Sequence, residues 1–140
     1  MSSQVKRVYE KPGPGDGTRI LVDRLWPRGL SKKAAAVDKW LRDLAPSDEL
    51  RKWYHAEQGG WTMFRKRYLR ELSRPAAASA LEELYQLARR GKVTLLFGSK
   101  NEDRNNAVVL KELLDGARKP PSGVGQSASR SRRARRMTRS

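Results

Sequence analysis

The sequence contains no cysteine and a single histidine, His55. The absence of cysteine excludes disulfides, thiolate nucleophiles and zinc–thiolate sites within this chain. With one histidine and scattered acids, no metal-ligand spacing is present, so the sequence predicts no metal site and indicates no particular cofactor. A glycine-rich phosphate motif and a nucleophile elbow are also missing, so no sequence motif assigns a reaction.

Long apolar runs are missing as well. No stretch approaches the roughly 18 apolar residues that a membrane span requires. The first ten residues, MSSQVKRVYE, lack the apolar segment of a signal peptide. These absences predict a cytoplasmic protein.

Acidic residues are scarce relative to basic ones: 15 against 31, for a net charge of +16. Residues 119–140 contain seven basic residues and no acid: Lys119, Arg130, Arg132, Arg133, Arg135, Arg136 and Arg139. Removing these seven from the 31 leaves 24 basic residues against 15 acids in residues 1–118, a net charge of +9. This balance predicts an anionic partner, whether a phosphate compound, nucleic acid, an acidic protein or lipid headgroups.

A chain of 140 residues fits one domain. After Gly116 the composition changes to Pro120-Pro121-Ser122-Gly123 and then to a serine–arginine run with almost nothing to bury. We therefore expect a single domain over residues 1–118 and a disordered basic tail over residues 119–140.

The hydrophobic pattern predicts three strands, over Val5–Tyr9, Arg19–Trp26 and Lys92–Phe97. The last two are mostly apolar, as in a sheet that is covered on both faces. The expected fold is therefore α/β, with a small, mostly parallel sheet of about three strands covered by about five helices.

The helices are predicted from apolar spacing and from residues that start or stop helices. Ser31 caps the first helix, whose apolar face holds Val37, Trp40, Leu41 and Leu44. Ser47 caps the second helix, which carries Leu50, Trp53 and Tyr54, and the third helix carries Trp61, Phe64, Tyr68 and Leu72. The fourth helix begins at Ser73 and Pro75 and ends at Gly91, and the last runs from about Glu102 to Asp115 and stops at Gly116.

Two loops are expected at the carboxyl ends of apolar strands, residues 23–29 and 98–106. Ligands of parallel α/β sheets bind beyond these ends, and helical crossovers keep neighbouring strands parallel, so we expect the two loops to share one crevice. The second loop leads into a helix whose N-terminus favours anions. The candidate ligand-binding residues are Arg24, Trp26, Arg28, Ser99, Lys100, Asn101 and Asn105.

Asp23 and His55 are the candidate catalytic residues. Asp23 can act as a base or orient the arginines, and His55 is the only side chain with an ordinary pKa near neutrality. Structural roles remain open for most of the candidates. Asp23 can bind amides of its own loop or an arginine, and Arg24 and Arg28 can pair with Asp23 or Asp43. Trp26 can fill a gap in the core. Asn101 can cap a helix, and His55 can have a structural role near a helix end.

One stretch, Leu21-Val22-Asp23-Arg24-Leu25-Trp26-Pro27-Arg28-Gly29, is distinctive. Shorter runs accompany it: Ala45-Pro46-Ser47, Leu50-Arg51-Lys52, Tyr54-His55, Phe64-Arg65, Tyr68, Glu71-Leu72, Thr94-Leu95-Leu96, Lys100-Asn101 and Asn105. Together they resemble a bacterial family, domain of unknown function 488, in its short YeaO-like branch. The resemblance spans roughly Val5 to Leu114. It implies an α/β fold and supports placing the two loops together.

Longer members of that family place cysteines and a His-Arg pair around the second loop, which implies redox or anion chemistry there. This sequence has Phe97, Asn105, Asn106 and Ala107 at the matching places, so it lacks the thiols. Short-branch relatives often have histidine where Asn106 stands.

The leading hypothesis is a protein that binds an anionic, phosphate-bearing small ligand between the two loops. Arg24, Arg28 and Lys100 would supply charge, Asp23 would orient them, and Asn101 and Asn105 would supply hydrogen bonds. Hydrolysis or transfer with His55 or Asp23 as base stays open. Two alternatives remain: a nucleic-acid-associated protein that uses its basic face and the arginines of residues 130–139, and an adaptor that contacts an acidic protein.

Overall fold

The computed structural model describes residues 3–56 and 60–118. Its elements in chain order are β1 (Ser3–Arg7), β2 (Thr18–Leu21), α1 (Lys32–Ala35), β3 (Lys39–Trp40), the 3-10 helix η1 (Arg42–Leu44), α2 (Asp48–His55), α3 (Trp61–Glu71), α4 (Pro75–Arg90), β4 (Val93–Phe97) and α5 (Asn106–Arg118). The predicted disordered tail, residues 119–140, lies outside the described residues, so the boundary after residue 118 stays a prediction.

The described strands form one parallel sheet in the order β1-β4-β2-β3. β4 lies inside this sheet, and Leu95 is level with Val5 of β1 on one side and Ile20 of β2 on the other. Every residue of β4 is buried. The predicted α/β class and parallel sheet are therefore confirmed.

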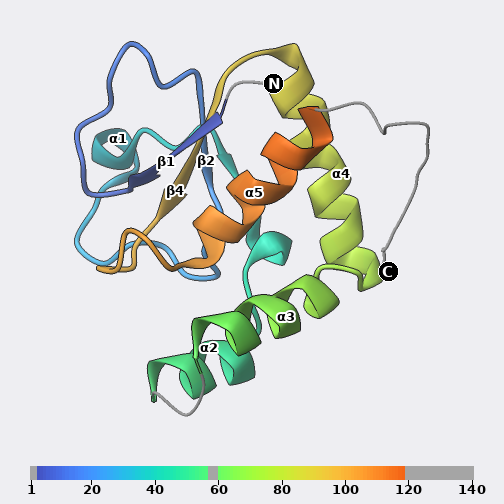
Figure 1. Cartoon of the computed structure of the whole chain (residues 1–140). Helices are drawn as coiled ribbons and strands as arrows, with labels where there is room; N and C mark the ends of the chain where they lie inside the picture. The colour runs from blue at the N-terminus through green and yellow to red at the C-terminus, as the bar shows by residue number, and fades with distance from the viewer. Residues whose placement is uncertain (1–2, 57–59, 119–140) are drawn as a thin grey trace.

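Helices and loops cover the two faces of the sheet unequally (Figure 1). On one face, Ile20, Leu95 and Phe97 belong to a large core with residues from α2 to α5, such as Tyr68 and Leu110. The other face holds a smaller cluster of Val8, Leu21, Ala35 and Leu96, against which Trp26, Leu30, Val37 and Trp40 pack. Figure 1 shows α4 and α5 on one side of the sheet and α1 on the other.

Several predicted helix ends agree with the structure. The Ser47 side chain accepts a hydrogen bond from the Leu50 N–H at 3.1 Å and so caps α2, as its position predicts. Pro75 occupies the first turn of α4, where its missing N–H costs nothing, and Gly91 follows the last residue of that helix.

The prediction of one helix from Ser31 to Leu44 is wrong. α1 ends at Ala35, Ala36 adopts a left-handed conformation, and the chain then forms β3 and η1, which makes four strands rather than three. The cause is tertiary: Arg19 of β2 donates to the Ala35 and Ala36 carbonyl oxygens at 2.8 and 3.0 Å. The Leu41 N–H donates to the Leu21 carbonyl at 2.9 Å, which ties the same segment to the sheet.

The boundaries of β1, β2 and α5 also differ from prediction. β1 begins and ends two residues earlier than expected, and β2 ends at Leu21 rather than Trp26. α5 begins at Asn106, because the Asn105 side chain accepts from the Val108 N–H at 3.1 Å and caps the helix there. Gly116 does not stop α5, which continues to Arg118.

A buried polar cluster joins the amino ends of the strands. The Asp16 carboxylate accepts from Arg19 at 2.6 Å, from Lys6 at 3.2 Å and from the Gly13 N–H at 3.0 Å. The Asp16 carbonyl also accepts from the hydroxyl of Thr94 in β4. The hydrogen bond from Gly13, together with those from Arg19 and Lys6, lowers the pKa of Asp16 to about 2 although burial opposes the shift.

We expect Asp16→Asn to lower the free energy of unfolding by about 2–3 kcal/mol near neutral pH, because it leaves buried Arg19 without its carboxylate. A lowered pKa stabilises the fold above the unfolded value of 3.8, and this stabilisation is lost as pH falls toward 2. The difference between wild type and variant should therefore be constant above about pH 5 and shrink below it in urea unfolding. A difference that does not change with pH would contradict this assignment.

Gly17→Ala should destabilise the protein far more than Gly29→Ala. Both glycines have positive φ, +65° and +82°, so alanine is strained at either position. Only at Gly17 would the new Cβ lie 2.2 Å from a backbone atom, the Lys92 carbonyl oxygen, whereas Gly29 has open space. We expect a loss of about 1 kcal/mol for Gly29→Ala and more than about 3 kcal/mol for Gly17→Ala by chemical denaturation. Equal losses would show that this contact relaxes freely.

Candidate functional site

The two loops expected to converge do leave the same edge of the sheet, because β2 and β4 are parallel neighbours. A cavity of about 260 Å³ lies between them and helices α2 and α3. Its lining comes from the first loop (Asp23, Arg24, Leu25), the second loop and the start of α5 (Gly98, Ser99, Arg104, Asn105, Asn106), α2 (Arg51, Tyr54, His55), α3 (Phe64) and the segment before α2 (Ala45, Pro46).

The cavity brings together some of the predicted site residues. Arg24, Ser99 and Asn105 of the predicted ligand-binding set line it, and so do both catalytic candidates, Asp23 and His55. The remaining four described candidates, Trp26, Arg28, Lys100 and Asn101, are not part of its lining.

Those four residues have other surroundings. Trp26 packs edge-on against Trp40, with ring centroids 5.5 Å apart, and its indole N–H donates to the Leu30 carbonyl. Arg28 and Lys100 have exposed side chains. The amide oxygen of Asn101 accepts from two backbone N–H groups of its own loop, so Asn101 shapes the loop but does not cap α5.

Asp23 ties the two loops together at the floor of the cavity. One carboxylate oxygen, Oδ2, accepts from the Gly98 N–H at 2.8 Å, and the other, Oδ1, accepts from the Asn106 side-chain amide at 3.2 Å. Asn106 also donates to the Val22 carbonyl at 3.0 Å. The carboxylate thus joins the ends of β2 and β4 and the start of α5, instead of binding the amides of its own loop.

Burial raises the pKa of the Asp23 carboxyl above its ordinary value. The hydrogen bonds from Gly98 and Asn106 and the positive charge of Arg51 oppose this effect without cancelling it. Asp23 is therefore partly removed from water and lies in the field of a cationic side chain.

Arg7 of β1 also fixes the second loop, through hydrogen bonds to its backbone carbonyls. Its guanidinium donates to the Ser99 carbonyl at 3.0 Å and to the Gly98 carbonyl at 3.3 Å, and it also lies over the Tyr9 ring. The position of Gly98 beside Asp23 is consequently fixed by hydrogen bonds on both its N–H and its carbonyl. A Cβ at Gly98 would lie 3.2 Å from the Asp23 carboxylate, so the close approach favours glycine.

Two of the lining arginines meet at one acid outside the cavity. Arg24 and Arg51 lie 3.8 and 3.3 Å from the same Asp48 carboxylate oxygen. All three side chains are partly exposed, so these ion pairs are weak and leave the guanidinium groups available to a ligand. Arg104, the third lining arginine, is exposed and has no ion-pair partner among the described residues.

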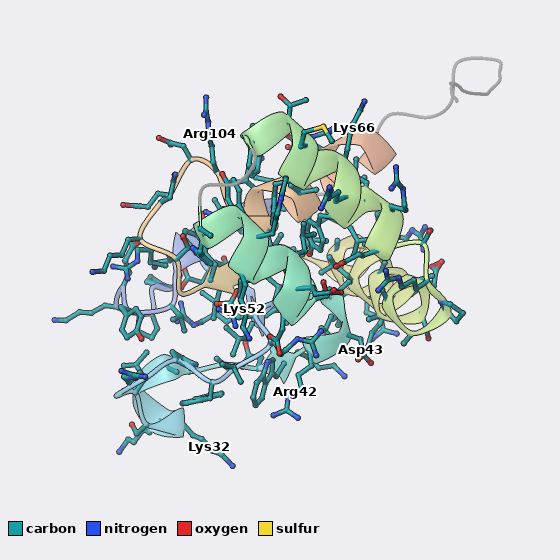
Figure 2. The ribbon with its side chains drawn as sticks, turned by 90° about the horizontal axis from the view of Figure 1, so that it is seen from below. Lys32, Arg42, Asp43, Lys52, Lys66 and Arg104 are labelled. Carbon is teal, nitrogen blue, oxygen red and sulfur yellow. The ribbon has the colours of Figure 1, made fainter. Side chains whose placement is uncertain are left out.

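An aromatic wall closes the cavity on the side of α2 and α3. The Tyr54 and Phe64 rings stack with centroids 4.4 Å apart, and Tyr54 also contacts Trp61 and His55. His55 is exposed at the end of α2. Figure 2, which views the molecule from below, shows α2 and α3 in front and Arg104 on the loop beside them.

Sequence reasoning did not assign Arg51, Tyr54, Phe64, Arg104 or Asn106 to the site. A signal for the α2 residues was present, because residues 51, 54 and 55 have the i, i+3, i+4 spacing of one helix face. That spacing does not tell which surface the helix face meets. The predicted nucleic-acid residues Arg130, Arg132, Arg133, Arg135, Arg136 and Arg139 lie outside the described part of the chain.

Among residues 3–56 and 60–118, no helix combines the length and apolar character needed to cross a membrane. No solved structure is significantly similar to the chain.

Comparison with known proteins places the chain in a family. It is 43% identical over 114 residues to the uncharacterized protein YeaO of Escherichia coli (strain K12), covering 81% of this chain and 97% of that protein. It is 44% identical over 113 residues to the uncharacterized protein Rv3073c of Mycobacterium tuberculosis (strain H37Rv), covering 81% of this chain and 93% of that protein. The profile described as the inactive DUF488-N3 subclade matches residues 2–131. The chain therefore belongs to the DUF488 family, within the subclade described as inactive DUF488-N3.

Proposed function

We propose that the protein binds a small, anionic, phosphate-bearing ligand in the cavity at the carboxyl ends of β2 and β4. The observation that carries this proposal is the charge of the lining. Arg24, Arg51 and Arg104 reach it from three separate segments, and Asp23 is the single acid among the lining residues. Guanidinium groups suit phosphate oxygens because they donate paired, charge-assisted hydrogen bonds.

The start of α5 adds to the positive potential. Asn105 caps this helix, and both Asn105 and Asn106 line the cavity, so the first turn of a 13-residue helix adjoins the binding space. The N-terminus of a helix favours an anion through its free N–H groups and its dipole. Arg51 and Arg104 thus take the role that the sequence suggested for Arg28 and Lys100.

The proposal is for binding and includes no reaction. The Asp23 carboxylate, on the first loop, already accepts hydrogen bonds from Gly98 and Asn106 at the two ends of the second loop, which is the geometry of a residue that holds the site together. The description of the matched subclade as inactive agrees with a binding role.

Arg51→Gln should weaken binding of ribose 5-phosphate by about tenfold or more, because it removes a charged donor from the cavity while keeping a polar side chain there. Isothermal titration calorimetry at low salt measures the affinity. A thermal-shift assay gives a second readout, since a ligand at one hundred times its Kd stabilises the folded state by about 2.7 kcal/mol.

Arg65→Gln is the matched control. Arg65 is exposed to a similar extent, 39% against 41% for Arg51, and is ion-paired with Glu112 away from the cavity. It should leave the affinity for ribose 5-phosphate unchanged. Equal affinities in wild type and Arg51→Gln, or an equal loss in both variants, would reject the cavity as the phosphate site.

A second candidate function is nucleic-acid association. Lys32, Arg42, Lys52, Lys66 and Arg104 project around the face shown in Figure 2 and have no ion-pair partner among the described residues. Residues 119–140 would add seven positive charges to such a surface. A surface of this kind binds phosphates without reading the base sequence.

If the basic tail drives this association, duplex DNA affinity should fall steeply with salt, with a log–log slope of about −5 to −6 for six or seven contacted phosphates. Deleting residues 119–140 should flatten the slope and remove most of the binding, as measured by fluorescence anisotropy. Binding that survives the deletion and ignores salt would contradict a tail-driven interaction.

A further inference from the structure

The lining of the cavity includes apolar surface that a phosphate group does not use. Leu25 is 66% exposed, the largest value among the large hydrophobic side chains that the structure describes, and it lies in the lining. Tyr54, which stacks on the buried Phe64 at an interplanar angle of 26°, also lines the cavity. A flat ring packed against Leu25 and Tyr54 would cover this apolar surface, which favours a ligand with an aromatic body.

The Asp23 carboxylate offers two acceptor oxygens to the same space. Each oxygen accepts one hydrogen bond from the described residues, at 2.8 Å from Gly98 and at 3.2 Å from Asn106. A carboxylate oxygen can accept two hydrogen bonds, so one acceptor position on each oxygen remains for a ligand. Two N–H groups side by side on one edge of a flat ring match this pair of acceptors.

We infer that the ligand of this cavity is a guanine mononucleotide, an inference that rests on the proposed phosphate-binding function. The N1–H and the 2-amino group of guanine donate to the two Asp23 oxygens, and the ring packs against Leu25 and the aromatic wall. The phosphate then faces Arg24, Arg51 and Arg104. Adenine and cytosine place an acceptor nitrogen beside their amino group, and a carboxylate repels that nitrogen.

The size of the cavity sets an upper limit on the ligand. A volume of about 260 Å³ is just below the roughly 300–1,000 Å³ usual for drug-sized ligands. A single nucleotide suits it better than a dinucleotide cofactor.

A panel of ligands tests the inference on the wild-type full-length protein. Isothermal titration calorimetry at about pH 8, where a carboxyl group is ionised, compares ribose 5-phosphate with the 5′-monophosphates of guanosine, inosine and adenosine. Guanosine monophosphate should bind at least about tenfold more tightly than adenosine monophosphate or ribose 5-phosphate. Inosine monophosphate should fall between them, because it keeps the N1–H and lacks the 2-amino group.

Two exposed residues supply a matched pair of variants that spare the core. Leu25→Ala should weaken guanosine monophosphate binding by about fivefold to tenfold more than it weakens ribose 5-phosphate binding, because only the base covers Leu25. Met63→Ala, which alters an exposed side chain outside the lining, should change neither affinity.

The results of these titrations distinguish guanine recognition from the phosphate binding on which it rests. If ribose 5-phosphate binds through Arg51 but guanosine and adenosine monophosphates bind equally well, guanine recognition is overturned and phosphate binding stands. If no phosphate ester binds, the proposed function fails and this inference fails with it. A Leu25→Ala variant that retains wild-type affinity for guanosine monophosphate would overturn the placement of the base.

Discussion

β4 pairs with β1 on one side and with β2 on the other, and this central position arranges both ends of the sheet. Because β4 pairs in parallel with both neighbours, the loops that follow β2 and β4 must leave the same edge of the sheet. The same pairing brings Thr94 beside Asp16 at the opposite end, where the buried cluster joins the strands. The central strand therefore fixes both ends of the sheet: the buried Asp16 cluster lies at the amino ends of the strands, and the cavity lies at their carboxyl ends.

The pairing of β2 with β4 also brings the Asp23 carboxylate into a partly buried position, where its charge destabilises the fold. Its raised pKa means that the ionised form at neutral pH lowers the free energy of unfolding relative to the protonated form. The Asp16 carboxyl, whose pKa is lowered to about 2, has the opposite effect at the other end of the strands. The two ends of the strands thus hold carboxyl groups whose ionisation has opposite effects on the stability of the fold.

The cavity combines features that separate elements supply. The two sheet-edge loops bring the acid, two arginines and Leu25, while α2 and α3 bring Arg51 and the aromatic wall. Two of the three arginines that line it, Arg24 and Arg51, form only weak ion pairs with Asp48, so their charge stays available. Charge, two hydrogen-bond acceptors and an apolar wall in one small space are what the proposed phosphate binding and guanine recognition require.

The α/β class, the helix that Ser47 caps and the shared edge of the two loops were predictable from the sequence, because apolar periodicity and capping chemistry are local and parallel crossovers follow a general rule. Five of the predicted site residues, Asp23, Arg24, His55, Ser99 and Asn105, line the cavity. The formation of β3 and η1 in residues 36–44, instead of a helix, depends on tertiary contacts, because Arg19 and the Leu21 carbonyl of β2 form hydrogen bonds with that backbone. Only the packing of α2 against the two loops brought Arg51 and Tyr54 to the cavity, because a helix face predicts which residues lie together but not what they meet.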